Sequence, residues 1–91
     1  MYKIFYTPKS EEKLAEIFWY ISQDSLFYAT KVIVSIKNTI DILKLFPLSW
    51  KDIGKINKIV VESKYKFKII YRIKWDTIYI ISVFKYKNSW E

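Results

Sequence analysis

The last third of the chain alternates apolar and cationic residues in a way that predicts a two-sided β-sheet. One set of alternate positions is apolar or aromatic: Tyr65, Phe67, Ile69, Tyr71 and Ile73. The positions between them are Lys66, Lys68, Ile70, Arg72 and Lys74. Because successive side chains of a strand point to opposite faces, residues 65–74 predict a sheet with one apolar face and one positive face.

Turn residues divide the rest of this region into further strands. We expect turns at Ser63-Lys64 and at Trp75-Asp76, so that strands at 56–62, 65–74 and 77–86 form an antiparallel meander. Residues 48–55, which include the only glycine, are predicted to be a loop. The alternating segment 1–6 predicts another strand, which we expect to join one edge of this sheet.

Apolar residues between the first strand and the meander recur at helical spacing, which predicts two helices. Thr7 is a suitable N-cap and Pro8 fits the first helical position, so the first helix is expected to run to about Ile21. Asp24 or Ser25 caps the second helix, which is expected to end near Leu45, before a proline. The second stripe comprises Ala29, Val32, Ile33, Ile36, Ile40 and Leu43.

These elements predict one α+β domain over residues 1–91, in the order β-α-α-β-β-β. Helices joined by a few residues form an antiparallel hairpin, which we expect to pack on one face of a mainly antiparallel four-stranded sheet. The other face would then carry the cations and remain available to an anionic partner.

Composition excludes several kinds of chemistry. The chain has no Cys and no His, which excludes disulfides and any catalytic triad with a His or Cys, and we expect no metal site and no cofactor. Acid–base chemistry would have to use Lys, Arg, Tyr or a carboxylate. No apolar run approaches the roughly 18–20 residues that span a bilayer, so we expect a soluble, cytoplasmic protein that does not contact membranes.

Positive charge is concentrated in the second half. Residues 1–50 hold six Lys and five acidic residues, a balance of +1, whereas residues 51–91 hold nine Lys, one Arg and four acidic residues, a balance of +6. This distribution favours binding to nucleic acid, to an acidic protein or to a membrane surface. General solubility of a Lys-rich protein is the alternative.

Several motifs occur along the chain in an order typical of one protein family. They are Phe5-Tyr6-Thr7-Pro8 with the first helical stripe, Phe46-Pro47 after the second, Tyr65 with Ile69-Ile70-Tyr71-Arg72 and Asp76, and Ile80-Ile81 with Val83 before basic residues. The chain resembles the RelE/ParE superfamily of toxins from two-gene toxin–antitoxin modules. Lys85 and Lys87 occupy the region where many members have a His, and Trp50-Lys51 replaces a frequent Gly-Arg. The long hairpin and the second helix around Ala29 resemble ParE-like members more closely.

The resemblance implies a type II toxin that inhibits growth and is neutralised by a cognate antitoxin, with which it would form a hetero-oligomer. ParE-like members inhibit DNA gyrase and are not enzymes, which makes gyrase the expected target. RelE-like members are endoribonucleases that cleave mRNA on the ribosome, and this alternative stays open. A non-catalytic or degenerate module that binds nucleic acid or an antitoxin is the third alternative.

Arg72 is the leading site residue, because the only arginine of the chain can hold a phosphate or carboxylate with two hydrogen bonds. Its structural alternative is a pair with Asp76 or Glu62. The full set expected to bind the target or nucleic acid is Lys51, Lys66, Lys68, Arg72, Lys85 and Lys87. If the protein cleaves RNA, the resemblance implies Arg72, Lys85 and Tyr86 as catalytic residues; packing at the edge of the core is the alternative for Tyr86.

The tryptophans outside the helices are candidates for contacts with a partner. Trp50 and Trp90 are expected either to bind the antitoxin or to cap the ends of the core. Trp75, in a predicted turn, is expected to pack against the core.

Overall fold

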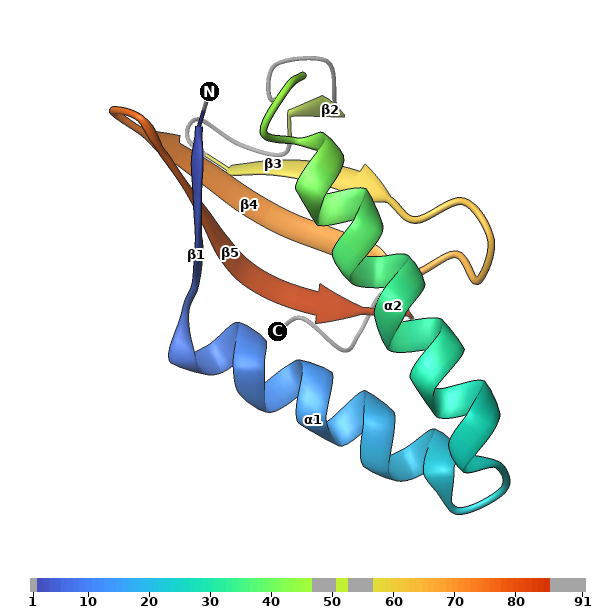
Figure 1. Ribbon diagram of the computed structural model, residues 1–91. Coiled ribbons are helices and arrows are strands. Elements are labelled where there is room, and N and C mark those ends of the chain that lie inside the picture. The colour runs from blue at the N-terminus through green and yellow to red at the C-terminus, as the bar shows by residue number, and fades with distance from the viewer. Residues whose placement is uncertain (1, 47–50, 53–56, 86–91) are drawn as a thin grey trace.

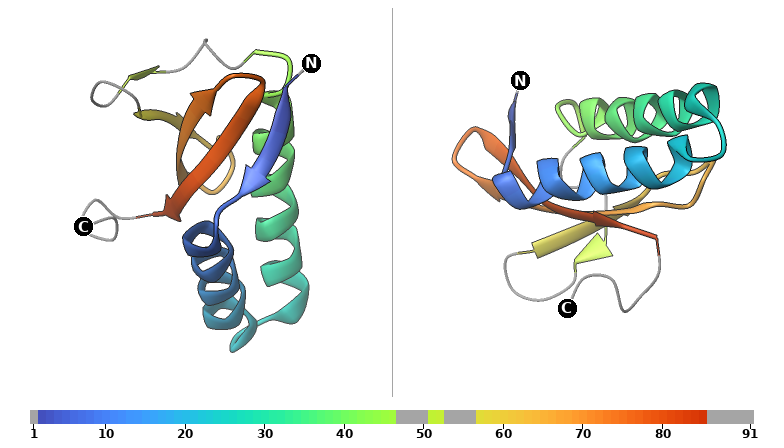
Figure 2. Two further views of the ribbon diagram at one scale, coloured as in Figure 1. Left: turned by 90° about the vertical axis from the view of Figure 1, so that its left-hand side faces the viewer. Right: turned by 90° about the horizontal axis from the view of Figure 1, so that it is seen from below.

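The computed structural model describes residues 2–46, 51–52 and 57–85 of the 91-residue chain (Figure 1). Its elements are β1 (Lys3–Tyr6), α1 (Pro8–Ser22), α2 (Leu26–Ile42), β2 (Lys51–Asp52), β3 (Asn57–Val61), β4 (Lys68–Lys74) and β5 (Thr77–Phe84). The two helices lie on the same side of the sheet (Figure 2). The α+β class and the helical hairpin on one face are therefore confirmed.

The strands form one mixed sheet in the order β1-β5-β4-β3-β2. β1 runs parallel to β5 at the edge, and the other neighbouring pairs are antiparallel. The sheet has five strands rather than the four predicted, because Lys51 and Asp52, expected in a loop, pair with Ile59 and Lys58 of β3. A strand of two residues is too short to show an alternating pattern in the sequence.

Both helices begin at the predicted caps. The Thr7 hydroxyl accepts a hydrogen bond from the N–H of Ser10 at 3.2 Å and donates one to the carbonyl of Ile80 at 2.6 Å. The cap therefore fixes the start of α1 against β5 as well as satisfying a free N–H of the first turn. Of the two candidate caps for α2, Ser25 fills the role by accepting from the N–H of Tyr28 at 3.1 Å.

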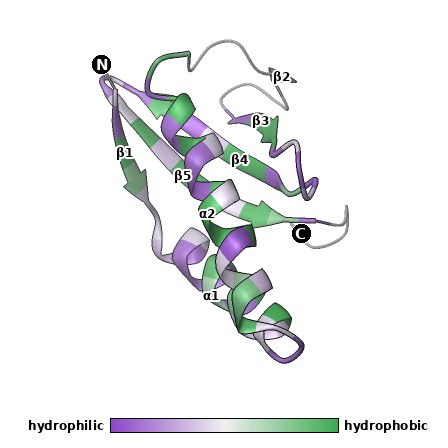
Figure 3. Ribbon diagram, turned by 45° about the vertical axis from the view of Figure 1, so that its right-hand side comes forward, coloured by the Kyte–Doolittle hydropathy of each residue, from purple (hydrophilic) through white to green (hydrophobic). Residues whose placement is uncertain are grey.

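The core lies between α2, α1 and the helix-facing side of the sheet. It consists of Leu14, Val32, Ile36, Ile40, Leu43, Val60, Phe67, Ile69, Tyr71, Ile78, Ile80 and Val83. The predicted apolar face of β4 is confirmed, since Ile69 and Tyr71 are fully buried. Figure 3 shows both hydrophobic and hydrophilic residues along β4, where Ile70 interrupts the alternation.

Residues 65–67, expected in a strand, instead belong to the connection between β3 and β4, so the predicted strand boundary was wrong. Lys66 has a φ of 66°, in the left-handed region, which interrupts the alternation of side chains. The carboxylate of Glu62 holds this connection by accepting from the N–H groups of Lys64 at 2.9 Å and Tyr65 at 2.8 Å. Ser35 of α2 donates a further hydrogen bond to the same carboxylate, so local and tertiary contacts of Glu62 together override the strand pattern.

We call the sheet surface opposite the helices the outer face. It is less uniformly positive than predicted, because Ile70 and Phe84 are buried although both lie on this side. Phe5 and Tyr79 add two aromatic rings near the β1 edge, with ring centroids 5.5 Å apart. The outer face thus combines apolar residues with cations, which changes the chemistry that it offers to a partner.

Candidate functional site

Strand register brings four side chains into one row across the outer face. Phe5 of β1 is opposite Tyr79 of β5, Tyr79 is opposite Arg72 of β4, and Arg72 is opposite Asn57 of β3. Side chains opposite each other on one face are close neighbours. We call these four residues the transverse row; Arg72 is the only one of them that the sequence singles out.

The side chain of Arg72 is exposed on the outer face. Among the described residues, the Arg72 side chain forms no hydrogen bond or ion pair. Asp76 instead lies 3.8 Å from the Lys3 ammonium, and Glu62 accepts a hydrogen bond from Ser35. The alternative role for Arg72, a pair with Asp76 or Glu62, is therefore not observed. Its guanidinium is available to a ligand on the outer face.

The other described cations of the predicted set do not gather around Arg72. Lys68 lies on the outer face, with its ammonium 5.9 Å from the centroid of the Phe84 ring. Lys66 lies in the connection before β4. The Lys85 ammonium is 5.6 Å from the centroid of Phe67, a core residue, which places Lys85 on the helix side of the sheet. Arg72 and Lys85 thus lie on opposite sides of the sheet.

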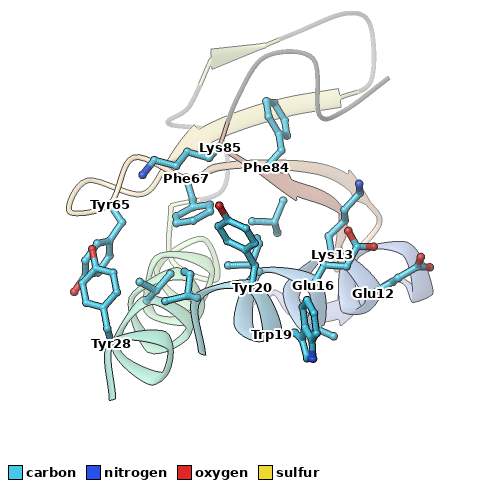
Figure 4. A pocket seen from close by; sticks show the side chains of 15 residues that line it. Glu12, Lys13, Glu16, Trp19, Tyr20, Tyr28, Tyr65, Phe67, Phe84 and Lys85 are labelled. Carbon is cyan, nitrogen blue, oxygen red and sulfur yellow. The ribbon is translucent and has the colours of Figure 1, made fainter. Parts of the chain in front are cut away.

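A second surface feature is a cleft of about 930 Å³ between the helices and the sheet (Figure 4). Ile17, Tyr20 and Ile21 of α1 line one wall, and Phe67 and Lys85 lie on the opposite side. Figure 4 shows the Tyr20 and Phe67 rings directed into this space. Tyr20 is 74% exposed and the neighbouring Trp19 66%, so the wall presents large apolar side chains to solvent.

The two sides of the cleft differ in charge. Glu12, Lys13 and Glu16 lie along α1, whereas Lys85 lies at the end of β5. The floor between them is apolar and includes Val32. Such a surface suits an amphipathic segment with an apolar stripe and charged flanks.

Among the described residues, Glu62 and Tyr6 have displaced pKa values, and both lie on the helix side of the sheet. Burial alone would raise the pKa of Glu62, but hydrogen bonds from Ser35 and from the N–H groups of Tyr65 and Lys64 outweigh it and lower the pKa below its usual value. Burial raises the pKa of Tyr6, and the negative charge of Asp41 adds to the effect. Glu62 is 1% exposed and its carboxylate binds groups of the fold, whereas Tyr6 is partly exposed.

Several predicted site residues lie outside the described residues: Trp50, Tyr86, Lys87 and Trp90. Lys51 begins β2, where its backbone pairs with Ile59. Trp75 contradicts its prediction, since it is 88% exposed in the β4–β5 turn instead of packing on the core. Its φ of 59° belongs to this two-residue turn, which directs the side chain away from the sheet core.

Phe5 and Tyr79 were missed as site residues. Each carries a strand-like aromatic signal, but their proximity depends on the parallel pairing of β1 with β5, which joins opposite ends of the chain. The exposed aromatic residues Trp19 and Tyr20 were also missed. They stand at the margin of the α1 apolar stripe, where sequence alone does not separate core from surface.

Comparison with known proteins identifies the fold. A chain of the solved structure described as the chromosomal ParDE TA system from P. aeruginosa superposes with a TM-score of 0.81, over 96% of this chain and 98% of that chain. The two sequences are 16% identical, so this likeness concerns the fold alone. No protein with a curated description matches the sequence.

The sequence itself identifies the family. The family model described as "ParE toxin of type II toxin-antitoxin system, parDE" matches residues 4–90. The match covers nearly all of the 91 residues and includes at least part of every element of the fold. This chain belongs to the ParE toxin family of type II toxin–antitoxin systems, which confirms the resemblance drawn from the motifs. Within the part of the chain that the structure describes, neither helix is long and apolar enough to cross a membrane.

Proposed function

We propose that this protein inhibits growth by acting on DNA gyrase and that a cognate antitoxin neutralises it. The family match over residues 4–90 carries this proposal. ParE-like members are expected to inhibit gyrase, whereas RelE-like members are expected to cleave RNA. The solved ParDE structure supports the same assignment through its fold.

The placement of the basic residues favours gyrase inhibition over RNA cleavage. Cleavage by attack of a 2′-hydroxyl requires cations that converge on one phosphate and stabilise its developing charge. Arg72 faces outward from the sheet, whereas Lys85 lies beside Phe67 on the helix side. Arg72 and Lys85 therefore do not reach a common phosphate. Inhibition of gyrase does not require the two residues to bind the same phosphate.

The cleft supports the second part of the proposal, the antitoxin. A helix of the partner would place an apolar stripe against Ile17, Tyr20 and Phe67 and so remove exposed apolar surface from water. An acidic flank on the partner would meet Lys85, and the excess positive charge of residues 51–91 would speed the encounter. Neutralisation by burial of this surface requires no covalent change in the toxin.

Induced expression in a bacterial host tests the proposal. We expect growth arrest with gyrase-dependent DNA breaks and cell filamentation, and no codon-linked cuts in primer extension on cellular mRNA. Codon-linked cuts without DNA breaks would replace gyrase with the ribosome as the target. Normal growth with soluble, folded protein would contradict the toxin assignment for this chain.

A further inference from the structure

The transverse row carries an inference beyond gyrase inhibition. We propose that the outer face binds single-stranded nucleic acid, with Phe5 and Tyr79 stacking on bases and Arg72 holding a phosphate. The three residues are consecutive members of one row across β1, β5 and β4. The proposal depends on the geometry of the outer face, and it shares Arg72 with the proposed action on gyrase.

The two aromatic rings are arranged so that they can accept a base. Phe5 and Tyr79 meet edge to face, with an interplanar angle of 62° and centroids 5.5 Å apart. This contact fixes both rings through each other, yet Phe5 remains 49% exposed. An exposed ring held by its neighbour is a stacking platform with little conformational entropy to lose when a base binds.

Two lysines, Lys3 and Lys74, lie in the row next to the aromatic rings. Lys3, Thr77 and Lys74 are mutually opposite on β1, β5 and β4, and they form the next row on the same face. This row is two residues, or about 7 Å, from the transverse row. Lys3 is partly compensated by Asp76 at 3.8 Å, whereas Arg72 has no ion pair among the described residues.

The combination fits an unpaired strand better than a duplex or an acidic peptide. Bases of a duplex stack on each other and present no free ring face to a flat sheet, whereas unpaired bases do. An acidic peptide would use the cations and leave Phe5 and Tyr79 without a role. A single strand engages the rings and the cations together, which makes it the ligand of matching chemistry.

Fluorescence anisotropy tests this directly with the full chain. The probe is a labelled oligodeoxythymidine of about 12 nucleotides, within the roughly 4–16 nucleotides that small single-strand-binding folds cover. We expect it to bind more tightly than a duplex of the same length. We also expect Phe5→Leu and Tyr79→Leu each to weaken binding by at least about fivefold, the lower bound for losing one stacked base.

Matched controls separate this site from general attraction to a basic protein. Phe27→Leu makes the same change at an exposed phenylalanine of α2, 72% exposed, and should leave the affinity unchanged. Arg72→Gln should lower the slope of log affinity against log salt by about 0.7, the contribution of one phosphate contact on a single strand. Equal effects of Phe5→Leu and Phe27→Leu, a preference for the duplex, or an unchanged salt slope for Arg72→Gln would overturn the proposal. None of these outcomes bears on growth arrest, so failure here is distinguishable from failure of the toxin assignment.

Discussion

Ser35 of α2 donates a hydrogen bond of 2.6 Å to the carboxylate of Glu62, which is almost fully buried just after β3. The same carboxylate accepts from two N–H groups of the β3–β4 connection, those of Lys64 and Tyr65. One side chain therefore joins the helical hairpin to the sheet and fixes the shape of the connection. Its ionised form is the one that the fold stabilises, since the hydrogen bonds lower its pKa despite its burial.

Replacing Glu62 with Gln should destabilise the fold by about 1–3 kcal/mol at neutral pH, because the amide cannot accept from all three donors. The stabilisation is complete above the unfolded-state pKa of about 4.3 and is lost as the pH falls through the lower folded-state pKa. The difference in free energy of unfolding between the wild type and the Glu62→Gln variant should therefore decrease below about pH 4. Urea denaturation at neutral pH and below pH 4 measures this difference. Glu16→Gln, at an exposed position of α1, is the control and should change the stability little.

Replacing Thr7 with Ala should cost about 2 kcal/mol of stability, towards the upper end for a lost helix cap. Its hydroxyl caps α1 and also bonds the carbonyl of Ile80, so both contacts disappear together. Ser25→Ala removes only the local bond to the N–H of Tyr28 and should cost about 1 kcal/mol. Equal losses for the two variants in thermal or urea denaturation would show that the contact with β5 contributes nothing.

Replacing Arg72 with Gln should abolish growth arrest while the free energy of unfolding changes by less than about 0.5 kcal/mol. The free energy of unfolding should change little because the Arg72 side chain is exposed and makes no ion pair among the described residues. Growth after induction, together with the circular dichroism melt of the purified variant, gives both quantities. Lys9→Gln removes an exposed positive charge from α1 and should remain toxic. Full toxicity of the Arg72 variant would refute its role at the site.

Replacing Tyr20 with Glu should preserve growth arrest but prevent rescue by the antitoxin. Tyr20 lines the cleft and is mostly exposed, so a carboxylate there is tolerated by the free toxin but not by an apolar partner. Co-expression with the small gene that we expect directly beside this one measures rescue. Phe27→Glu changes a similarly exposed aromatic residue that does not line the cleft, and rescue should persist. Rescue of both variants would place the antitoxin elsewhere.

Local patterns in the sequence predicted most of the fold. Thr7 and Ser25 cap the helices as expected, and the alternation from Ile69 to Ile73 correctly placed the core face of β4. These features depend on neighbours in the chain or on a period of two residues. The prediction for the β3–β4 connection was wrong because its conformation depends on the carboxylate of Glu62, which also binds the hydroxyl of Ser35 on a distant helix.

The surfaces were harder to predict than the fold. Arg72 was recognised because a lone arginine among lysines is a visible signal, and the structure leaves it accessible. Its neighbours in the transverse row were not recognised, because Phe5 and Tyr79 meet only through pairing between the first and last strands. Lys85 and Arg72 are both positively charged but lie on opposite sides of the sheet. Counting charges along the sequence cannot reveal this difference.

Inhibition of purified DNA gyrase is the most direct test of the account. The full chain, added to gyrase with relaxed plasmid and ATP, should block supercoiling in proportion to its concentration, and the Arg72→Gln variant should not. A parallel translation reaction programmed with a defined mRNA should show no cleavage of that message. Unimpaired supercoiling at a large molar excess of folded toxin would contradict gyrase as the target, and cleavage of the mRNA would assign the protein to the ribosome instead.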